Sequence, residues 1–247
     1  MSGAAALTTE GIVKKFGGLV VLNGVSVVIP DGEIVGLIGP NGAGKTTFFN
    51  VVTGFLRPEA GEFSYYGQNA TGRLPYQIAR MGVSRTFQVV KPFPSLLVRE
   101  GVMIGAYKNT SRRKTAEEIA AWAMDLVGIG GLAERRYGSC NLMQTKLVDL
   151  ARCLATKPKM LLIDELAAGL TPAEMNELID VLKRINRQEH ITMCVVEHVI
   201  RFIMNLSNRI MVLHQGGIIA EGAPSEIVNN PAVVAAYLGE SATGAQK

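Results

Sequence analysis

Long apolar runs, paired cysteines and a leader-like start are all missing from this sequence of 247 residues. No apolar run reaches the ~18 to 20 residues that a membrane-spanning helix requires, because Lys, Arg, Asp or Gly interrupts every stretch. Residues 1–9 have neither a basic start nor a long apolar segment, so a secretory signal is not expected. Cys140, Cys153 and Cys194 are far apart and form no CxxC pair, which argues against a zinc site or a disulfide framework. We therefore expect a cytoplasmic chain that does not cross the bilayer and keeps its thiols reduced.

Charge of one sign is not concentrated in the sequence either. The formal net charge is +4, and the basic residues are scattered apart from Arg112-Arg113-Lys114, which begins a helical pattern and is most simply a solvated surface. Such a balance tolerates an anionic ligand or a membrane surface and does not require nucleic acid. The length, with 48% hydrophobic residues, suffices for one large domain or for a core domain with a subdomain.

A glycine-rich segment carries the clearest chemistry. Gly39-Pro40-Asn41-Gly42-Ala43-Gly44-Lys45-Thr46 matches the pattern GxxxxGK[ST] between an apolar strand-like run and a helical segment. The glycines let backbone amides close around phosphate oxygens, and the N-terminus of the following helix adds a partial positive charge. Lys45 would bridge the terminal phosphates, and the Thr46 hydroxyl would bind Mg²⁺. The sequence therefore predicts ATP and Mg²⁺ as ligands, with this nucleotide-binding set: Gly39, Asn41, Gly42, Ala43, Gly44, Lys45, Thr46 and Thr47.

Two further strand-like runs end in polar residues. Leu161-Leu162-Ile163 leads into Asp164 and Glu165, and acidic residues at the C-terminal end of a parallel strand lie beside the ligand crevice. We expect Asp164 to help hold Mg²⁺ and Glu165 to orient and partly deprotonate the attacking water. Val195-Val196-Glu197 ends in the same way at His198. The expected catalytic residues are therefore Lys45, Glu165 and His198.

Alternating β-rich and helical patterns predict an α/β fold. We expect a P-loop NTPase core with a mostly parallel sheet, an N-terminal antiparallel β portion and an inserted α-helical subdomain. Residues 1–93 form the first part of the nucleotide-binding core, residues 94–158 the helical subdomain, and residues 159–238 the second part of the core. The tail at residues 239–247, with its Ser, Thr, Gly and Gln, is expected to be disordered.

The order of these motifs resembles the ATP-binding cassette (ABC) ATPases over nearly the whole chain. In that family an upstream aromatic residue stacks on adenine, which implies this role for Phe16 in Lys14-Lys15-Phe16-Gly17-Gly18. The family also has a glutamine between the core and the helical subdomain. Gln88, in Arg85-Thr86-Phe87-Gln88, matches it, which implies that Gln88 is a nucleotide and Mg²⁺ ligand. The resemblance also makes His198 the switch histidine that senses the γ-phosphate. The family's loop after the Mg²⁺ carboxylates is similar to Ala168-Gly169-Leu170-Thr171-Pro172.

A closer resemblance is to the ATPases of branched-chain or hydrophobic amino acid importers, a subgroup that also imports other small molecules. It implies a peripheral protein at the cytoplasmic face of the inner or plasma membrane, with transmembrane permease subunits as direct partners. A solute-binding protein would be an indirect partner, and no nucleic acid is implied. The resemblance rests on these stretches: Phe16-Gly17-Gly18-Leu19, Phe87-Gln88 followed by Pro92-Phe93, Ala167-Ala168-Gly169-Leu170, and Val196-Glu197-His198 with Asn230-Pro231 and Ala236-Tyr237-Leu238-Gly239.

The sequence departs from the family at its signature, LSGGQ or a near variant, which begins a helix and contacts the γ-phosphate bound by the opposite subunit. The equivalent positions are Cys140-Asn141-Leu142-Met143-Gln144, of which Gln144 alone is retained. We expect Met143 to place a Cβ and a thioether where glycine would admit the phosphate, while Asn141 could still cap the helix. Leu166 replaces a proline that fixes φ but contributes no chemistry. These departures favour a heterodimer with a second ABC ATPase, in which turnover depends on the partner.

Two other functions stay open at this point. The altered signature is compatible with a nucleotide-gated subunit that has little turnover of its own. The second open function is that of a non-transport ABC ATPase acting on ribosomes or DNA, although such proteins usually carry two cassettes in one chain or a long coiled coil. Residues 89–97, with the apolar Phe93, Leu96 and Leu97, are candidates for contact with a membrane subunit, and internal packing is the alternative.

Overall fold

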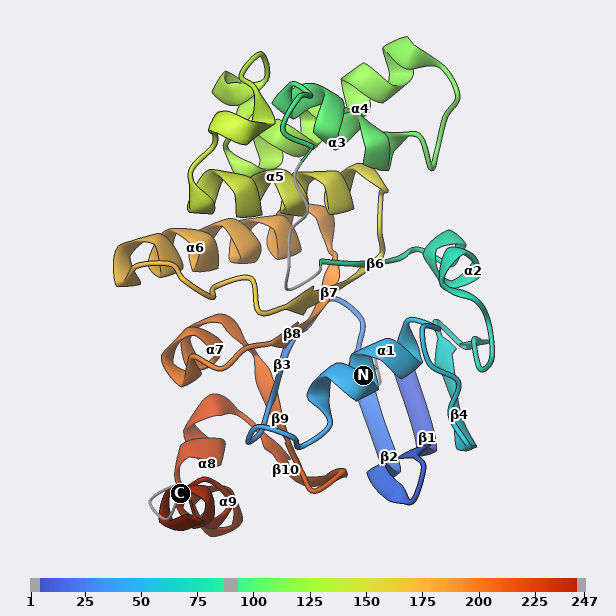
Figure 1. Cartoon of the computed structure of the whole chain (residues 1–247), viewed down its shortest axis with the longest axis vertical. Coiled ribbons are helices and arrows are strands. Elements are labelled where there is room, and N and C mark those ends of the chain that lie inside the picture. The colour runs from blue at the N-terminus through green and yellow to red at the C-terminus, as the bar shows by residue number, and fades with distance from the viewer. Residues whose placement is uncertain (1–4, 87–92, 244–247) are drawn as a thin grey trace. The chain divides into compact units, whose positions relative to one another are not determined.

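The computed structural model describes residues 5–86 and 93–243, with side chains up to residue 237. The chain forms two compact units. The first unit comprises Met1–Met81 and Thr192–Lys247, and the second unit comprises Gly82–Ile191. Figure 1 labels most of the strands and helices, which are numbered in chain order.

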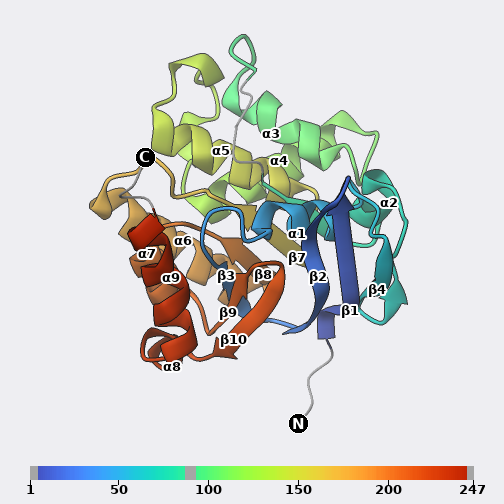
Figure 2. The same cartoon turned by 60° about the horizontal axis from the view of Figure 1, so that its bottom comes forward.

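The first unit begins with an antiparallel sheet whose strand order is β2-β1-β4-β5. Its strands are β1 (Ala5–Phe16), β2 (Leu19–Pro30), β4 (Ala60–Tyr65) and β5 (Gln68–Asn69). In β2 the buried residues Val25, Val27 and Ile29 alternate with exposed ones, which is the two-residue period of a strand with one buried face. Figure 2 shows β1 and β2 side by side next to α1 (Lys45–Val52), which contacts β2.

A second sheet of the first unit is centred on β3 (Ile34–Ile38), which pairs in parallel with β8 (Thr192–Val196) and with β9 (Arg209–His214). All residues of β3 and β8 are buried, which fits parallel strands covered on both faces. The last strand, β10 (Gly217–Gly222), runs antiparallel to β9. The remaining helices of this unit are α2 (Pro75–Arg80), α7 (Ile200–Leu206), α8 (Pro224–Val228) and α9 (Pro231–Thr243).

The second unit combines a parallel strand pair with helices. Strands β6 (Val83–Arg85) and β7 (Met160–Asp164) pair in parallel, and β7 is buried along its whole length. Helices α3 (Val98–Ala106), α4 (Arg113–Val127) and α5 (Leu142–Ala155) pack on one another. Two short 3₁₀ turns, η1 (Gly130–Leu132) and η2 (Tyr137–Ser139), and helix α6 (Pro172–Glu189) complete the unit.

The helix that follows β7 shows how the sequence fixes an element boundary. Thr171 lies at the N-cap of α6, and its hydroxyl accepts a hydrogen bond from the backbone N–H of Glu174 at 3.3 Å. The Glu174 carboxylate in turn accepts the N–H of Thr171 at 2.8 Å, which completes a capping box. Pro172 occupies the first helical turn, where its missing N–H removes no intrahelical bond.

The structure confirms the α/β class, with mostly parallel pairing in the sheet that contains β3, an antiparallel N-terminal sheet and a helical segment in the predicted order. The boundaries predicted at residues 93 and 158 stay a prediction, since they divide the chain by sequence pattern. The disorder predicted from Gly239 also stays a prediction, and α9 continues to Thr243. Helix propagation adds one hydrogen bond for each residue fixed, so a helix begun at Pro231 extends through Ser and Thr positions of moderate propensity. Residues 244–247 lie outside the described residues.

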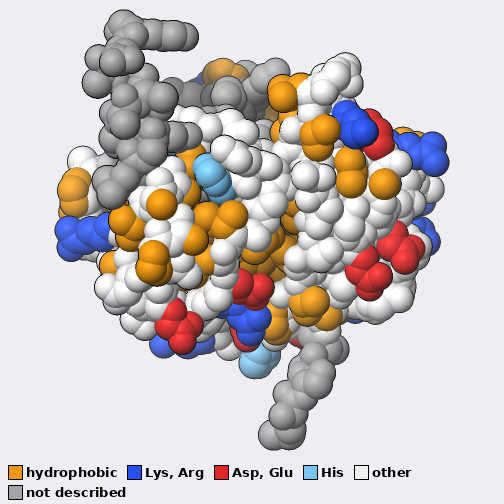
Figure 3. Space-filling model, turned by 90° about the horizontal axis from the view of Figure 1, so that it is seen from below, with side chains coloured by type: hydrophobic (Ala, Val, Ile, Leu, Met, Phe, Trp, Pro, Cys, Tyr) orange, Lys and Arg blue, Asp and Glu red, His pale blue; other side chains and the backbone are white. Residues whose placement is uncertain are grey.

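No helix of the described chain combines the length and the apolar character that crossing a bilayer demands. On the face drawn in Figure 3, Lys and Arg side chains are interspersed with Asp and Glu. That face therefore carries no field of a single sign.

A close backbone contact between α3 and α5 gives a stability test. A Cβ added at Gly105 of α3 would overlap the carbonyl oxygen of Arg152 in α5. We predict that Gly105→Ala lowers the free energy of unfolding by about 1–3 kcal/mol, because overpacking a tight contact forces backbone shifts. Helix propensity alone predicts the opposite, a gain of roughly 1 kcal/mol from replacing glycine by alanine.

Urea unfolding of both variants checks this prediction. The matched control is Gly131→Ala, since a Cβ added at Gly131 meets no atom within 4 Å. A Gly105→Ala chain that unfolds at the same or a higher urea concentration than the unchanged chain would contradict the contact.

Candidate functional site

The glycine-rich loop connects β3, which ends at Ile38, with α1, which begins at Lys45. Gly44, at the N-cap of α1, has φ +107°, a conformation that side-chain-bearing residues rarely adopt. A Cβ added at Gly39 would overlap the carbonyl oxygen of Leu213, and the carbonyl of Ala43 accepts the N–H of Gly216 at 3.2 Å. The loop is therefore pressed against the strand β9 and the turn that follows it, and its shape requires glycine.

Lys45 lies buried over this loop. Its ammonium Nζ donates hydrogen bonds to the carbonyl oxygens of Gly39 at 2.5 Å and of Pro40 at 2.8 Å. The first turn of α1 contains no acidic residue, so the positive end of the helix dipole is not compensated from within the helix. A phosphate group fits this arrangement, because the lysine and the helix N-terminus both favour an anion at the same point.

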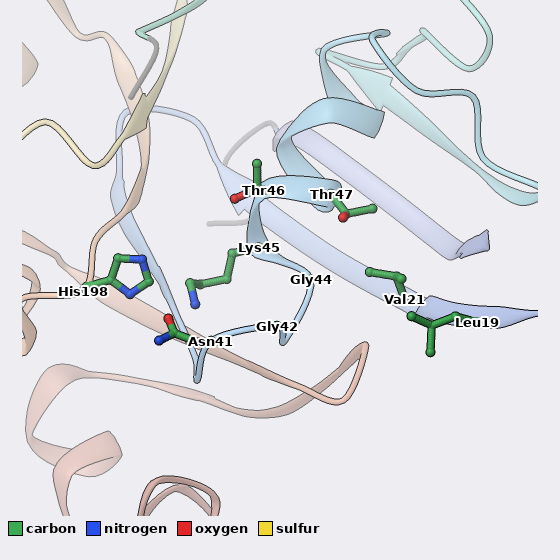
Figure 4. A pocket seen from close by; sticks show the side chains of 9 residues that line it. All are labelled: Leu19, Val21, Asn41, Gly42, Gly44, Lys45, Thr46, Thr47 and His198. Carbon is green, nitrogen blue, oxygen red and sulfur yellow. The ribbon is translucent and has the colours of Figure 1, made fainter. Parts of the chain in front are cut away.

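A cavity of about 380 Å³ opens beside the loop (Figure 4). In Figure 4 the His198 ring lies beside the side chains of Lys45 and Asn41, whereas Leu19 and Val21 lie on the other side of the loop. The cavity therefore has a polar end and an apolar end, which suits a ligand with a phosphate chain and an aromatic base. Its lining residues are Leu19, Val21, Asn41, Gly42, Gly44, Lys45, Thr46, Thr47 and His198.

Most of the nucleotide-binding residues expected from the sequence line this one cavity, and Thr46 is exposed there with its hydroxyl available to a cation. Gly39 and Ala43 shape the loop from behind and are not among its lining residues. Phe16 does not line the cavity either; it ends β1 and is 48% exposed. Sequence reasoning missed Leu19 and Val21, although two apolar residues directly after the Gly17-Gly18 turn were a usable signal.

The second unit carries the two carboxylates. Asp164 ends the buried strand β7, and its Oδ2 accepts a hydrogen bond from Arg85 Nη2 at 2.7 Å. Both side chains are buried, so each charge requires the other or an equivalent partner in a medium of low dielectric constant. The N–H of Asp164 also donates to the Thr86 hydroxyl at 3.1 Å. An ionised carboxylate held in this way is the oxygen ligand that Mg²⁺ prefers.

Glu165 follows Asp164 and is half-buried, with φ +49°. A non-glycine residue in the left-handed region costs about 1–3 kcal/mol, and such residues cluster at functional sites. Asp164 and Glu165 belong to the second unit, while Lys45, Thr46 and His198 belong to the first, and we treat their assembly into one site as a proposal. Gln88 lies outside the described residues.

The positions equivalent to the family signature form the start of α5. Asn141 is the N-cap, with its side-chain oxygen accepting the Gln144 N–H at 2.8 Å, as the sequence suggested. The expectation for Met143 needs correction: Met143 is 5% exposed, whereas Leu142 is 51% exposed. Helical periodicity is the reason, because Met143 shares its face with the buried Leu147 and Leu150. Leu142 is thus the residue that places an apolar side chain at the surface of this turn.

Leu142 also contacts the loop that follows the carboxylates. A Cβ added at Gly169, which has φ +79°, would lie 3.0 Å from Leu142 Cδ2. Leu166, the other departure from the family pattern, is buried. The Leu142 side chain therefore lies beside Gly169 at the surface of this turn.

Comparison with known proteins gives matches along most of the chain. A family model described as "ABC transporter" matches residues 22–168. A second model, described as "Branched-chain amino acid ATP-binding cassette transporter", matches residues 218–243.

Two curated relatives have similar length. The high-affinity branched-chain amino acid transport ATP-binding protein BraF of Pseudomonas aeruginosa is 36% identical over 95% of this chain and 98% of its own. The corresponding protein LivG of Escherichia coli K12 is 38% identical, also over 95% of this chain and 98% of its own.

Solved structures agree with the fold. An ATP-binding cassette of an ABC transporter, crystallised in its ADP conformation, superposes with a TM-score of 0.87 at 30% identity over 95% of this chain and 99% of that chain. A nucleotide-free cassette superposes with a TM-score of 0.84 at 30% identity, over 94% and 98% of the two chains.

Lys45 gives the most direct test of the loop. We predict that Lys45→Met weakens binding of a nucleoside triphosphate roughly ten- to a hundred-fold, because a hydrogen bond to a charged group contributes about 1.5–3 kcal/mol. Equilibrium titration with a fluorescent triphosphate measures the change. The control is Lys114→Met, which removes one exposed charge from the start of α4. Equal affinities for Lys45→Met and the unchanged chain would show that the loop does not hold phosphate.

Proposed function

The chain belongs to the ATP-binding cassette (ABC) transporter ATPases, and from this premise we propose that it energises an importer of branched-chain or other hydrophobic amino acids, or of related small molecules. It is an ATP-hydrolysing subunit of a transporter, and its ABC domain binds ATP. The observation that carries the proposed substrate class is the 36–38% identity, over almost the full length, to ATP-binding proteins of branched-chain amino acid transport. The family match over residues 218–243 supports the same class.

The residues of the first unit bind the nucleotide. The loop amides and the Lys45 ammonium hold the phosphate chain, and Lys45 exchanges its two carbonyl partners for phosphate oxygens. His198, at the same polar end of the cavity as Lys45, would contact the γ-phosphate, and Phe16 would stack on adenine. This assignment is supported by the polar and apolar ends of the cavity.

The carboxylates of the second unit, together with Thr46 of the first, would supply the remaining groups for hydrolysis. Asp164, Thr46 and Gln88 would hold Mg²⁺, which neutralises charge on the phosphate oxygens when it is bound. Glu165 orients the attacking water and accepts its proton, a step worth typically about 10²–10⁴ in rate. Glu165 has a left-handed backbone, a conformation that clusters at functional sites, which supports a role for it that differs from that of Asp164.

We place the chain in a head-to-tail pair with a different ABC ATPase, at the cytoplasmic face of the membrane and against permease subunits. The pairing is supported by the start of α5, where Leu142 is exposed and the Asn141 side chain already takes the Gln144 N–H. Fewer donors remain there for a phosphate bound by the partner. The partner's nucleotide site is therefore the weaker one, and the site built on Lys45 and Glu165 is the hydrolytic one.

Contact with a permease would use the exposed side of the segment at Phe93. The Phe93 ring is 43% exposed, with the guanidinium carbon of Arg152 at 6.0 Å from its centroid. Leu96 and Leu97 are half-buried, so the structure supports surface contact for Phe93 and internal packing for the two leucines.

A second candidate function is a nucleotide-gated subunit with little turnover of its own. The exposed Leu142 favours it, because this side chain occupies the surface that a γ-phosphate would have to approach. The two functions differ in whether the Lys45 site turns over once the partner is present.

An exchange of one residue in the heterodimer distinguishes them. We predict that Glu165→Gln in this chain lowers ATP turnover of the complex about 10²- to 10⁴-fold while ATP binding persists, because the general base is lost and the phosphate contacts remain. Steady-state hydrolysis and nucleotide titration of the co-purified complex measure the two quantities. Glu177→Gln, on the exposed side of α6, is the control and should leave turnover unchanged.

The same replacement in the partner provides the opposing result. If replacing the equivalent glutamate of the partner by glutamine removes most of the ATP turnover and Glu165→Gln does not, the assignment of the hydrolytic site to this chain is wrong. A complex with no turnover in any form would favour the nucleotide-gated subunit.

A further inference from the structure

The end of β1 is held by the carboxylate of Glu59, which lies directly before β4. Glu59 Oε1 accepts a hydrogen bond from Lys14 Nζ at 2.6 Å, and Glu59 Oε2 accepts the backbone N–H of Lys15 at 2.8 Å. Lys14 Nζ also donates to the carbonyl oxygen of Arg57 at 2.9 Å. We call Glu59, Lys14 and the Lys15 backbone the Glu59 clamp.

The clamp replaces strand pairing that stops at this point. Pairing between β1 and β4 ends at Val13 and Ala60, so the Lys15 N–H lies beyond Ala60, the first residue of β4. The Glu59 carboxylate accepts this N–H instead, and the Glu59 N–H itself donates to Val13 at 2.9 Å. Glu59 therefore extends the hydrogen bonding of β1 beyond β4, through both its backbone N–H and its carboxylate.

The other edge of β1 is irregular over the same residues. Lys14 pairs with Leu22 of β2, but Lys15 pairs with Val20, so Val21 is an extra residue on β2. Such a bulge bends a strand and redirects its side chains. Val21 lines the cavity, and so does Leu19, the register partner of Phe16. The irregular end of this hairpin thus adjoins the apolar end of the cavity.

Phe16 is the side chain that the clamp holds in place. Lys14 Nζ lies 5.5 Å from the centroid of the Phe16 ring, within the distance of a cation–π contact. The ammonium is fixed by Glu59 and Arg57, so it covers one face of the ring from a defined position. The ring is nevertheless about half exposed, which leaves surface for a second planar group.

We propose that Glu59 is a positioning residue for the nucleotide base: it fixes Lys14 and the end of β1 so that the free face of Phe16 meets adenine. The proposal rests on the stacking role proposed for Phe16. Glu59 acts through Lys14 and Phe16 and needs no contact with the nucleotide. Its effect is confined to the base, because the phosphate chain is held by the loop at Lys45.

The clamp is charged at neutral pH. The hydrogen bond from Lys14, and then that from the Lys15 N–H, hold the pKa of Glu59 below its ordinary value of 4.5. A carboxyl whose pKa is lowered on folding stabilises the fold above its unfolded pKa and loses that contribution as the pH falls through the folded value. The clamp is therefore intact wherever the transporter works near neutral pH.

Comparing two ligands separates the base from the phosphates. We predict that Glu59→Gln in the full chain weakens ATP binding about two- to five-fold, the range expected for loss of one exposed ion pair, and leaves tripolyphosphate binding unchanged. Glu62→Gln is the matched control, since Glu62 lies three residues further along and contacts only the exposed Asn69 among its side-chain hydrogen bonds given by the structure. Isothermal titration with each ligand provides the affinities.

The variant Phe16→Ala tests whether Glu59 acts through the Phe16 ring. It should weaken ATP binding by roughly ten-fold with no effect on tripolyphosphate binding, and adding Glu59→Gln to Phe16→Ala should cause no further loss of ATP affinity.

A Glu59→Gln effect that is equal for ATP and tripolyphosphate, or that persists without the Phe16 ring, would overturn the proposal in favour of a structural role. An unchanged ATP affinity in Glu59→Gln, with a loss in Phe16→Ala, would overturn it while leaving the stacking role intact. If Phe16→Ala itself binds ATP normally, the stacking role fails and the proposal fails with it.

Discussion

The buried ammonium of Lys45 is the constraint on which the phosphate site depends. A cation removed from water requires oxygen partners, and the loop supplies the carbonyl oxygens of Gly39 and Pro40 at hydrogen-bond distance. Those carbonyls can face the ammonium only because the loop is pressed against Leu213 and passes through a left-handed glycine at position 44. The same folding of the backbone directs the N-terminus of α1 at the cavity, so the geometry that satisfies the lysine also creates the phosphate site.

Charge is handled differently in the second unit. Asp164 is buried with Arg85 as its counter-ion, and the next residue, Glu165, has a left-handed backbone with φ +49°. A carboxylate paired with a buried arginine and a neighbouring carboxylate that accepts a proton from water are the two groups that we propose for Mg²⁺ binding and for ATP hydrolysis. The altered start of α5 sets a limit on what the chain does alone, because an exposed Leu142 stands where the family presents glycine. The proposed heterodimer follows from this contrast between an intact loop with its carboxylates and an altered signature.

Local patterns predicted most of the loop and its neighbours. The buried strand before it and the helix after it came from residues adjacent in sequence, and the structure places them as β3 and α1. Long-range contacts could not be predicted in this way: Arg85 and Asp164 are 79 residues apart, and Lys14 and Glu59 are 45 apart. No local signal marks these pairs, since each partner is an ordinary charged residue until the fold brings it to the other. The direction of Met143, by contrast, was predictable from helical periodicity with Leu147 and Leu150.

The central claim is that this chain binds ATP by itself and depends on a different polypeptide for turnover. The most direct measurement is ATP turnover per mole of the purified chain over a wide range of chain concentration, alongside its equilibrium affinity for ATP. The account predicts stoichiometric binding with turnover that stays near the background rate at every concentration and rises on addition of the partner ATPase. Turnover per mole that increases with the concentration of the chain alone would show a productive homodimer and would contradict the account.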